Sequence, residues 1–360
     1  MKIGFDGLPL TTKEHCGVRH YAENFLDALA SIDKDNLYSI YSRSYVPIPQ
    51  QSNFRLRIVP KKFPIFRRQI QLPLEIHRDA VDIFHYLDPY GSLGLNHPRI
   101  VTTVHDTRLQ NIFPKKISYP ESIDWINCEI TRFFTFKRTH IFIPVSKIVH
   151  AEVEKFRSRD QKNVVVYEGV RRIYTQQIHV RKKRILAFQD FSPRKNIQAV
   201  IEAYLLLPVQ LRSLYRVTVI APNKTIQTSL TSMVKNRVDA SSFEIKTNVS
   251  ESELITLYNE SICLVYPSLY EGFGLPIVEA MACGCPVITS NYGAMSEVAG
   301  NAALLVSLFS YKEIADAMGA IMVDKKLRER LIANGKKRAS IFSWLETAKQ
   351  TLKIYRDIAK

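Results

Sequence analysis

Short apolar runs alternate with longer segments of helical periodicity along the whole chain. The runs that predict strands in the first half are Lys2–Asp6, Leu37–Tyr41, Phe54–Val59, Ile83–Tyr86, Ile100–Val104, Ile141–Val145 and Val164–Tyr167. Those in the second half are Ile185–Phe188, Val217–Ile220, Phe243–Lys246, Ile262–Tyr266, Val287–Thr289 and Ala303–Val306. Strands that alternate with helices favour two parallel, doubly wound sheets.

Apolar residues at every third or fourth position predict the intervening helices. They cover Val18–Ala30, Ser118–Thr139 and Lys147–Phe156 in the first half, and Asn196–Leu207, Glu251–Ser261, Leu275–Cys283, Tyr311–Met322 and Lys325–Ala339 in the second. Ser146 precedes one of these helices and is a typical N-cap residue. The chain ends in a further amphipathic segment, Ser343–Ala359, in which we expect Trp344 to be a core anchor.

The length of the chain indicates more than one hydrophobic core. A chain of 360 residues is too long for one ordinary core, so we expect two domains. A polar and basic stretch between Gly169 and Arg184 is the expected linker. We therefore assign residues 1–175 to a first Rossmann-like domain, 176–342 to a second, and 343–360 to a C-terminal helix.

The most informative run of residues is Ser268–Ile288, SLYEGFGLPIVEAMACGCPVI. It follows an apolar strand and combines a turn containing two glycines, a helix beginning at Leu275-Pro276, and another strand. In such a layout, backbone N–H groups and a helix N-terminus face an anion. Glu271 and Glu279 are spaced so that both reach one ligand, and carboxylates accept hydrogen bonds from sugar hydroxyls. Taken singly, each glutamate is better explained as a surface charge, whereas for the whole run that explanation is the weaker one.

This run resembles the E-x7-E signature of the retaining glycosyltransferases of family 4, and the resemblance extends over most of the chain. It implies the GT-B fold, in which two Rossmann-like doubly wound domains face a cleft and a C-terminal helix crosses back to the first domain. It also implies that Glu271 meets the donor sugar, that the backbone of Phe273, Gly274 and Leu275 faces sugar and phosphate, and that Glu279 holds the ribose.

A second motif, Ser192-Pro193-Arg194-Lys195-Asn196, opens a helix. The family has a Gly-Arg pair followed by a Lys, and these cations grip the donor diphosphate. Lys195 fits the family Lys, but Gln189-Asp190 occupies the Gly-Arg positions. Either Arg194 replaces the missing cation, or Lys195 and helix dipoles act alone. A solvated helix start is the alternative for both residues.

The first half contains two weaker candidates. Gly17, with Arg19 after it, resembles the glycine loop that starts the first helix of the family and binds the donor or acceptor; Arg19 is as consistent with a solvated position. His105 ends an apolar strand, where sites form in α/β proteins. The family has a His-Asp pair here beside the donor sugar, so His105 joins Glu271 and Lys195 as a predicted catalytic residue. A smaller departure is Glu168, where the family usually has Asn before Gly169.

Charge adds a possible partner. The net charge is +16, and the segment from Arg55 to Arg68 contains six basic residues and no acid. Aromatic residues lie between them, a mixture that suits an anionic bilayer as well as a solvated loop. We treat Arg19, Lys61, Lys62, Arg67 and Arg68 as a candidate acceptor or membrane patch.

Other features narrow the class of protein. No apolar run approaches the ~18 residues of a membrane span, and the N-terminus lacks the pattern of a signal peptide, so we expect a cytoplasmic protein. A peripheral position at the inner membrane face is compatible with this expectation. Five scattered cysteines favour reduced, buried thiols. The family resemblance implies no metal and no cofactor besides the nucleotide sugar.

Together these features predict a retaining, metal-independent hexosyltransferase. It would use a nucleoside diphosphate sugar, with GDP-mannose slightly favoured because the His105-Asp106 context resembles bacterial mannosyltransferases of surface polysaccharide pathways. The acceptor would be a saccharide or a lipid-linked sugar. Alternatives are an inactive glycosyltransferase-like partner and a sugar-nucleotide epimerase or phosphorylase of the same fold. Nucleic-acid binding, suggested by charge alone, is disfavoured because carboxylates facing the ligand would repel a phosphate backbone.

Overall fold

We describe the protein from a computed structural model of residues 1–360. The structure describes residues 1–11, 17–59, 67–89, 91, 98–107, 123–177, 181–235, 237, 239 and 242–359, and only the backbone of residues 67–68 and 123–130. The chain divides into unit 1, Met1–Gly169 with Trp344–Lys360, and unit 2, Val170–Ser343. The sequence placed these boundaries at 175/176 and 342/343.

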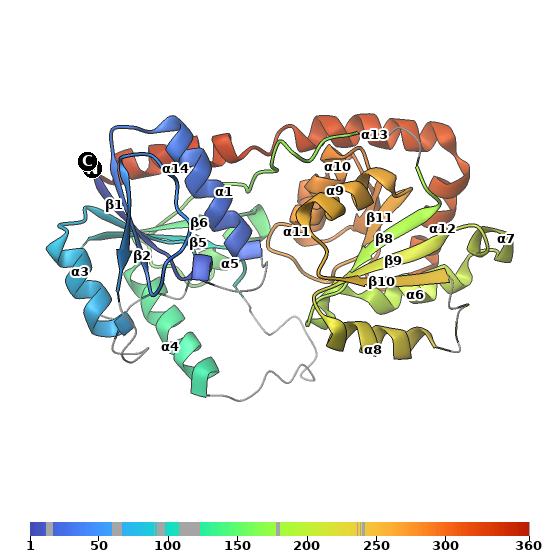
Figure 1. The fold of residues 1–360 in the computed structure, drawn as a ribbon, viewed down its shortest axis with the longest axis horizontal. Coiled ribbons are helices and arrows are strands. Elements are labelled where there is room, and N and C mark those ends of the chain that lie inside the picture. Colours follow the sequence, from blue (N-terminus) through green and yellow to red (C-terminus); the bar gives the residue numbers. More distant parts are fainter. Residues whose placement is uncertain are drawn as a thin grey trace. The chain divides into compact units, whose positions relative to one another are not determined.

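The described residues of unit 1 form a seven-stranded parallel sheet of order β3-β2-β1-β4-β5-β6-β7 (Figure 1). Its strands are β1 (Lys2–Asp6), β2 (Leu37–Ser42), β3 (Phe54–Ile58), β4 (Ile83–Tyr86), β5 (Arg99–Val104), β6 (Ile141–Pro144) and β7 (Lys162–Asn163). Its helices are α1 (Gly17–Ile32), α3 (Leu72–Arg78) after the π-helical turn η2 (Arg67–Gln71), α4 (Ile123–Arg138), α5 (Lys147–Glu154) and α14 (Trp344–Ala359), with a short 3-10 turn η1 (Pro9–Thr11).

Alternating side chains of the unit 1 strands build two apolar layers. Phe84 and Tyr86 of β4 pack with Leu72 and Ile76 of α3 on one face. On the other face, Phe5 of β1 packs edge-on against Phe25 of α1. The period of two along a strand sends neighbouring residues to opposite faces, which is why one sheet serves both layers.

The C-terminal helix α14 belongs to unit 1, as predicted. It lies beside α1 in Figure 1, and Trp344 packs edge-on against Tyr21 with ring centroids 5.6 Å apart. Trp344 is 8% exposed, so its predicted role as a core anchor is confirmed. Because α14 covers apolar surface of unit 1, the last residues of the chain complete a core built mostly from the first 169.

The described residues of unit 2 form a six-stranded parallel sheet of order β10-β9-β8-β11-β12-β13. Its strands are β8 (Arg184–Phe188), β9 (Arg216–Ala221), β10 (Phe243–Thr247), β11 (Cys263–Tyr266), β12 (Val287–Ser290) and β13 (Leu304–Val306). The helices are α6 (Ile197–Leu206) after the 3-10 turn η4 (Pro193–Lys195), α7 (Val209–Arg212), α8 (Lys224–Val234), α9 (Glu251–Glu260), α10 (Leu275–Ala282), α11 (Gly293–Ala299), α12 (Tyr311–Val323) and α13 (Lys325–Ala339).

Most predicted elements are confirmed to within a few residues, and Ser146 caps α5 by accepting from Val149 N at 3.4 Å. The predicted strand Val164–Tyr167 is wrong. The paired strand is only Lys162–Asn163, although Val164 N and Val166 N still donate to Phe142 O and Pro144 O of β6. This segment continues the edge strand β7, which pairs with β6 on one side only, so its regular strand pairing ends after two residues. The first residues of the predicted helix Ser118–Thr139 lie outside the described residues.

Candidate functional site

Two loops of unit 2 meet where its strand order reverses. β8 is the first strand of the unit, and β11 lies on its other side from β9. The loop after β8 leads to Lys195, and the loop after β11 leads to Glu271. Ligands of open parallel sheets bind outside the carboxyl ends of the strands at such a switch point. The topology therefore brings two motifs, separated by more than seventy residues, to one place.

The centre of this place is a closed set of hydrogen bonds among three side chains. Lys195 Nζ donates to Glu271 Oε1 at 2.7 Å and also to the hydroxyl of Tyr266. Tyr266 donates to the same Oε1 at 2.9 Å. The Lys195 ammonium also lies 4.7 Å from the centre of the Tyr266 ring, a cation–π distance. Each member orients the other two, so the carboxylate has a fixed position.

Arg194 and Asp190 complete the charge of this cluster, which we call the Lys195 cluster (Asp190, Arg194, Lys195, Tyr266 and Glu271). Arg194 Nη1 lies 3.7 Å from Glu271 Oε2, and Arg194 Nη2 lies 3.5 Å from Asp190. Asp190 lies 4.0 Å from Lys195 Nζ. Two cations thus face two carboxylates, and the formal charges balance.

Burial and charge act in opposite directions on Glu271. Burial disfavours the charged carboxylate, but Lys195 and Arg194 outweigh it and lower its pKa to about 2. Burial likewise disfavours the charged form of Lys195, yet Glu271 raises the pKa of this ammonium above its ordinary value. Both groups are charged at neutral pH. Glu271 is therefore a hydrogen-bond acceptor there and has no proton to give.

The turn after Glu271 leaves the sheet through a glycine that the conformation requires. Gly274 has φ +99° and precedes α10, and a Cβ there would also lie 3.2 Å from Ile277 Cδ1. The helix begins at Leu275. The side chain of Phe273 is buried edge-on against Phe342, with centroids 5.4 Å apart. The contact of its backbone with a ligand stays a prediction. Glu271, Gly272, Phe273 and Gly274 are all buried, so this turn is anchored in the core of unit 2.

Glu279 lies one turn inside α10 with a tyrosine partner. The hydroxyl of Tyr258, on α9, donates to Glu279 Oε2 at 2.9 Å. Tyr258 is fully buried, and burial together with the Glu279 charge raises its pKa well above the ordinary value. A buried phenol that stays protonated holds this carboxylate in place.

Gln189 and Asp190, at the positions of the family Gly-Arg pair, shape the loop instead of supplying a cation. Gln189 Nε2 donates to the carbonyls of Asp190 and Ser192 at 2.8 and 3.1 Å. Asp190 Oδ1 accepts from Ser192 N at 2.6 Å. Arg194 is a second cation beside Glu271, after Lys195, and it also lies 3.5 Å from Asp190, which occupies the position of the family arginine.

His105 lies just after β5, in unit 1. Its Nδ1 is 3.0 Å from Glu168 Oε1, and its Nε2 is 3.0 Å from the carbonyl of Leu87. The Tyr21 ring meets it edge-on at 4.6 Å between centroids. Burial disfavours the charged imidazole, but Glu168 and then Asp88 raise its pKa above the ordinary value.

The other candidates of unit 1 carry less information. A Cβ at Gly17 would meet no atom of the described residues within 4 Å, so there is open space at the start of α1. Arg19 Nε donates to Glu23 at 2.8 Å, one turn along the same helix. Arg19 is therefore paired on its own helix in this structure.

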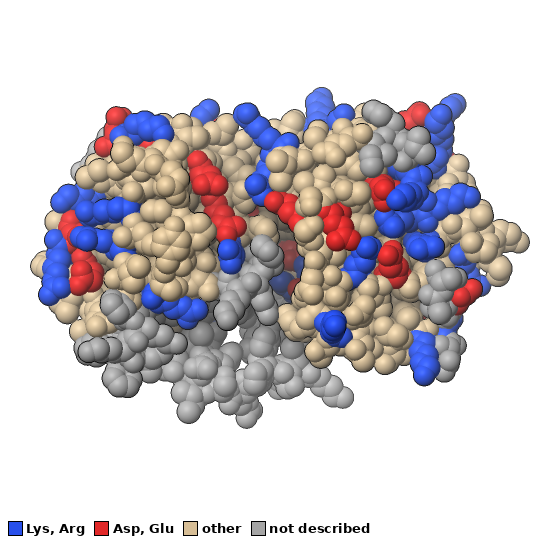
Figure 2. All heavy atoms as spheres, viewed as in Figure 1, with Lys and Arg blue, Asp and Glu red and all other residues tan. Residues whose placement is uncertain are grey.

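The basic segment is only partly described. Lys61 and Lys62 lie outside the described residues, and of Arg67 and Arg68 only the backbone is described. Arg57 forms an ion pair with Asp79, which also lies 3.5 Å from Arg55. These two arginines at the start of the segment thus share one carboxylate, which balances one of their two charges within unit 1. Figure 2 shows Lys and Arg side chains spread over both units on the face drawn, with acidic side chains among them.

Sequence reasoning missed Tyr266 and the acid Asp190 as members of the Lys195 cluster. Tyr266 occupies the last position of a buried strand, where a tyrosine is usually a core residue. The position of Tyr266 could have indicated its role, because the carboxyl end of a strand at a switch point faces the ligand site. Glu168 was recognised as a departure from the family, but its contact with His105 needed the tertiary structure.

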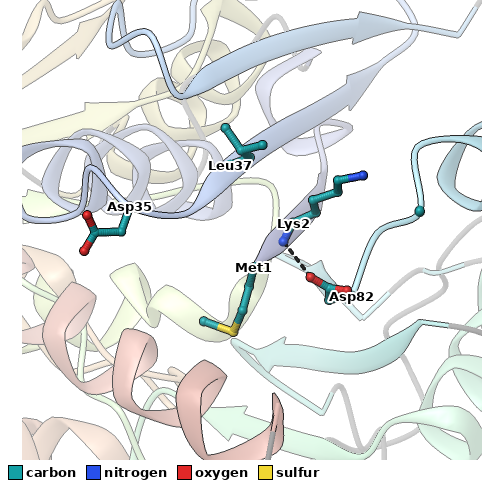
Figure 3. A pocket seen from close by; sticks show the side chains of 6 residues that line it. Met1, Lys2, Asp35, Leu37 and Asp82 are labelled. Carbon is teal, nitrogen blue, oxygen red and sulfur yellow. Dashed lines mark hydrogen bonds between the residues drawn. The ribbon is translucent and has the colours of Figure 1, made fainter.

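A pocket of ≈ 410 Å³ lies in unit 1 (Figure 3). Met1, Lys2, Asp35, Leu37, Ala80 and Asp82 line it. Lys2 and Leu37 begin their strands, so the pocket lies at the amino edge of the unit 1 sheet, and Lys2 N donates to Asp82 across it at 2.7 Å. Ligand sites of parallel sheets form at the opposite edge.

No group of three or more metal-ligating side chains comes together among the residues that the structure describes. Asp33 and Asp35 have the Asp-x-Asp spacing of some metal sites. However, Asp33 accepts hydrogen bonds from Asn36 and Tyr38 and stabilises the turn before β2. In the same described ranges, no helix is long and apolar enough to cross a membrane.

Comparison with known proteins identifies the class of unit 2. Residues 173–338 match the family model "Glycosyl transferases group 1". O-antigen chain mannosyltransferase B of Escherichia coli is 34% identical over 49% of this chain and 48% of its own. The MMP alpha-(1->4)-mannosyltransferase of Mycolicibacterium hassiacum is 33% identical over 48% of this chain and 43% of its own. The matched segment spans about half of these relatives or less.

Solved structures extend the likeness to the whole fold. Sucrose-phosphate synthase of Thermosynechococcus elongatus has a TM-score of 0.81 at 18% identity and covers 99% of both chains. HepE of Anabaena, in complex with UDP-glucose, has a TM-score of 0.75 at 15% identity over 99% of this chain and 100% of its own. The chain therefore has the predicted GT-B fold, and its unit 2 carries a glycosyl transferases group 1 domain. The Lys195 cluster lies inside that domain.

Proposed function

We propose that this protein is a retaining, metal-independent glycosyltransferase. It transfers a hexose from a nucleoside diphosphate sugar, with GDP-mannose the favoured donor, to a saccharide or lipid-linked acceptor. Lys195 and Glu271 belong to the donor site in this proposal, and His105 is a third catalytic residue. The observation that carries the proposal is the Lys195 cluster at the switch point of a glycosyl transferases group 1 domain.

The cluster has the chemistry to bind a sugar and its leaving group together. The Lys195 ammonium carries three protons, and Glu271 and Tyr266 take two of them. A third proton and the Arg194 guanidinium remain to stabilise the negative charge that grows on a departing diphosphate. Glu271, ionised at neutral pH, accepts hydrogen bonds from sugar hydroxyls.

Metal independence rests on these same cations. In sites that use a divalent ion, the ion neutralises the leaving phosphate. Here two fixed cations lie within 4 Å of Glu271 and supply that charge from the protein. We therefore expect full transfer activity in the presence of EDTA, and loss of activity that Mg²⁺ or Mn²⁺ restores would contradict this part.

Mannose and retention draw on the relatives' names. Both named relatives are mannosyltransferases, and one forms an alpha-(1->4) linkage. The anomeric bond of GDP-mannose is itself α, so forming an α product from it retains configuration. Proton NMR of the new anomeric centre distinguishes the two outcomes, and a β product would exclude retention.

We propose that the basic segment binds an anionic membrane at its cytoplasmic face, where a lipid-linked acceptor would lie. Ile58, Ile70 and Leu74, close to the basic segment, are each about half exposed, which adds apolar area to its charge. Changing Lys61, Lys62, Arg67 and Arg68 to Gln leaves the Asp79 ion pairs intact. We expect this variant to bind vesicles containing anionic lipid at least tenfold more weakly than the wild type; equal binding would remove the membrane from the proposal.

The donor is tested by thermal shift with GDP, UDP and dTDP, followed by transfer assays with sugars of the nucleotide that stabilises most. Glu271→Ala and Lys195→Ala should each abolish transfer. Lys312→Ala is the matched control, because Lys312 is 80% exposed and paired only with Asp316 on α12.

The assay also separates the alternatives. Nucleotide binding without transfer to any acceptor would favour an inactive partner. Conversion of the nucleotide sugar without an acceptor would favour an epimerase. Unchanged transfer in both site variants would show that the Lys195 cluster is not the site.

A further inference from the structure

Both ring nitrogens of His105 face groups that accept hydrogen bonds. Nδ1 lies 3.0 Å from the Glu168 carboxylate, and Nε2 lies 3.0 Å from the Leu87 carbonyl. A neutral imidazole has one donor and one acceptor nitrogen, and a carbonyl cannot donate. The Leu87 contact therefore fixes a proton on Nε2, and the Glu168 contact requires a second proton between Nδ1 and the carboxylate.

The position of Glu168 makes this contact persistent. Its side chain is 6% exposed, so water does not compete for the carboxylate. The adjacent residue, Tyr167, is tied to α14, because Thr347 Oγ1 donates to its carbonyl at 2.7 Å. The carboxylate is thus held at His105 by the backbone of its own loop and by the C-terminal helix.

The other groups around His105 decide on which side the shared proton lies. Asp88, in the loop after β4, adds negative potential at the imidazole. His85 of β4 is fully buried, and burial lowers its pKa to about 3, so it stays neutral and adds no positive charge. Tyr21 of α1 presents its ring edge-on, and its pKa is raised by burial. Among the neighbours that the structure describes here, two are acids and none is a cation, which favours the proton on the imidazole.

We propose that Glu168 is a positioning residue that holds His105 as an imidazolium with a fixed ring plane, so that His105 acts as a fixed cation and not as a proton acceptor. A general base needs a neutral histidine. In this ion pair His105 is an imidazolium, which has no lone pair to take the acceptor's proton. The protonation state rests on the geometry and the charges around the ring, whereas its role in sugar transfer rests on the proposed function.

The protonation state is tested by ¹⁵N NMR of the full chain labelled at histidine, with His105→Gln identifying the resonances. At pH 7.5 we expect both His105 nitrogens to have imidazolium shifts. In Glu168→Gln the carbonyl oxygen still accepts but the charge is gone, so the midpoint should fall by at least one pH unit, a tenfold change in proton affinity. Neutral-tautomer shifts in the wild type at pH 7.5 would overturn the proposal.

Glu154→Gln is the matched control. It removes a carboxylate 3.7 Å from another histidine, His150, at an exposed position on α5. Its His105 resonances should be unchanged. Glu168→Asp keeps the charge on a shorter side chain and should restore the imidazolium in part; if Glu168→Gln does not fold, this variant and the wild-type titration still decide the question.

Transfer kinetics test the catalytic half separately. A fixed cation predicts a kcat that is retained at acidic and neutral pH and falls as His105 deprotonates, with the fall moved to lower pH in Glu168→Gln. A kcat that instead rises with pH through the His105 midpoint would identify a general base and overturn the proposal. Absence of any transfer would refute the proposed function while leaving the NMR result standing.

Discussion

Two cation–carboxylate pairs lie at the carboxyl ends of parallel strands in this protein, one in each unit. In unit 2, Lys195 meets Glu271 at 2.7 Å, with Arg194 and Tyr266 beside them. In unit 1, His105 meets Glu168 at 3.0 Å, with a backbone carbonyl on the other side of the ring. Both acids are largely buried, but the basic partners differ in kind.

This difference sets how each pair responds to pH. Lysine keeps its charge far above neutrality, so the unit 2 pair changes only when its acid is protonated. Histidine titrates near neutrality, so the unit 1 pair changes when its base loses a proton. A similar arrangement of atoms thus gives a permanent charge pair in one unit and a titratable one in the other.

The largest expected effect comes from breaking the permanent pair. Lys195→Met leaves a buried carboxylate without its main partner, which costs about 3–5 kcal/mol of unfolding free energy. Denaturant titration of the variant measures the loss. The double variant Lys195→Met with Glu271→Gln should recover much of it; no recovery would mean that the loss arises from packing and not from an unpaired charge.

Opposite pH windows are the next expected effect. The pKa of Glu271 is lowered from 4.5 to about 2, so its contribution is complete above pH 4.5 and is lost as pH falls towards 2, about 3 kcal/mol in all. The pKa of His105 is raised, so its contribution is complete below pH 6.5 and is lost as pH rises through the folded-state pKa. Unfolding free energies of the wild type, Glu271→Gln and Glu168→Gln across pH measure both windows. If both pairs lost their contribution to stability in the same pH range, the proposed difference between the two pairs would be contradicted.

A smaller effect isolates the hydroxyl that the sequence did not reveal. Tyr266→Phe removes a hydrogen bond to each charged member of the pair and should cost about 1.5–3 kcal/mol of unfolding free energy. Tyr258→Phe, which removes one hydrogen bond to Glu279, should cost less. Equal losses would show that Tyr266 does not orient the pair.

The smallest effect concerns the balance of charge in unit 2. Asp190→Asn removes one of the two acids facing Lys195 and Arg194 and should strengthen binding of the favoured nucleoside diphosphate about three- to tenfold, or ~1 kcal/mol. Calorimetric titration of the wild type and the variant measures it. Asp316→Asn, an exposed change on α12, is the control and should leave the affinity unchanged.

The sequence by itself determined the elements and the main motifs. Apolar periodicity located most strands and the longest helices, because side-chain spacing follows the local period of each element. The E-x7-E run, Lys195 and His105 were found from their positions after strands together with the resemblance to the glycosyltransferase family. Helices α3, α7, α8 and α11 were not predicted. Helix α8 is rich in Ser and Thr, which are weak helix formers, and it is stabilised by packing Leu230 and Val234 onto the sheet.

Only the tertiary structure decided which of these residues meet. Local periodicity does not determine the order of strands in a sheet. The strand order of unit 2 reverses between β8 and β11, and this reversal places Lys195 beside Glu271 and Tyr266. Likewise, Glu168 meets His105 across 63 residues of sequence. The charge of each pair follows from burial and distance, because these set the balance between desolvation and attraction, and neither is fixed until the chain has folded.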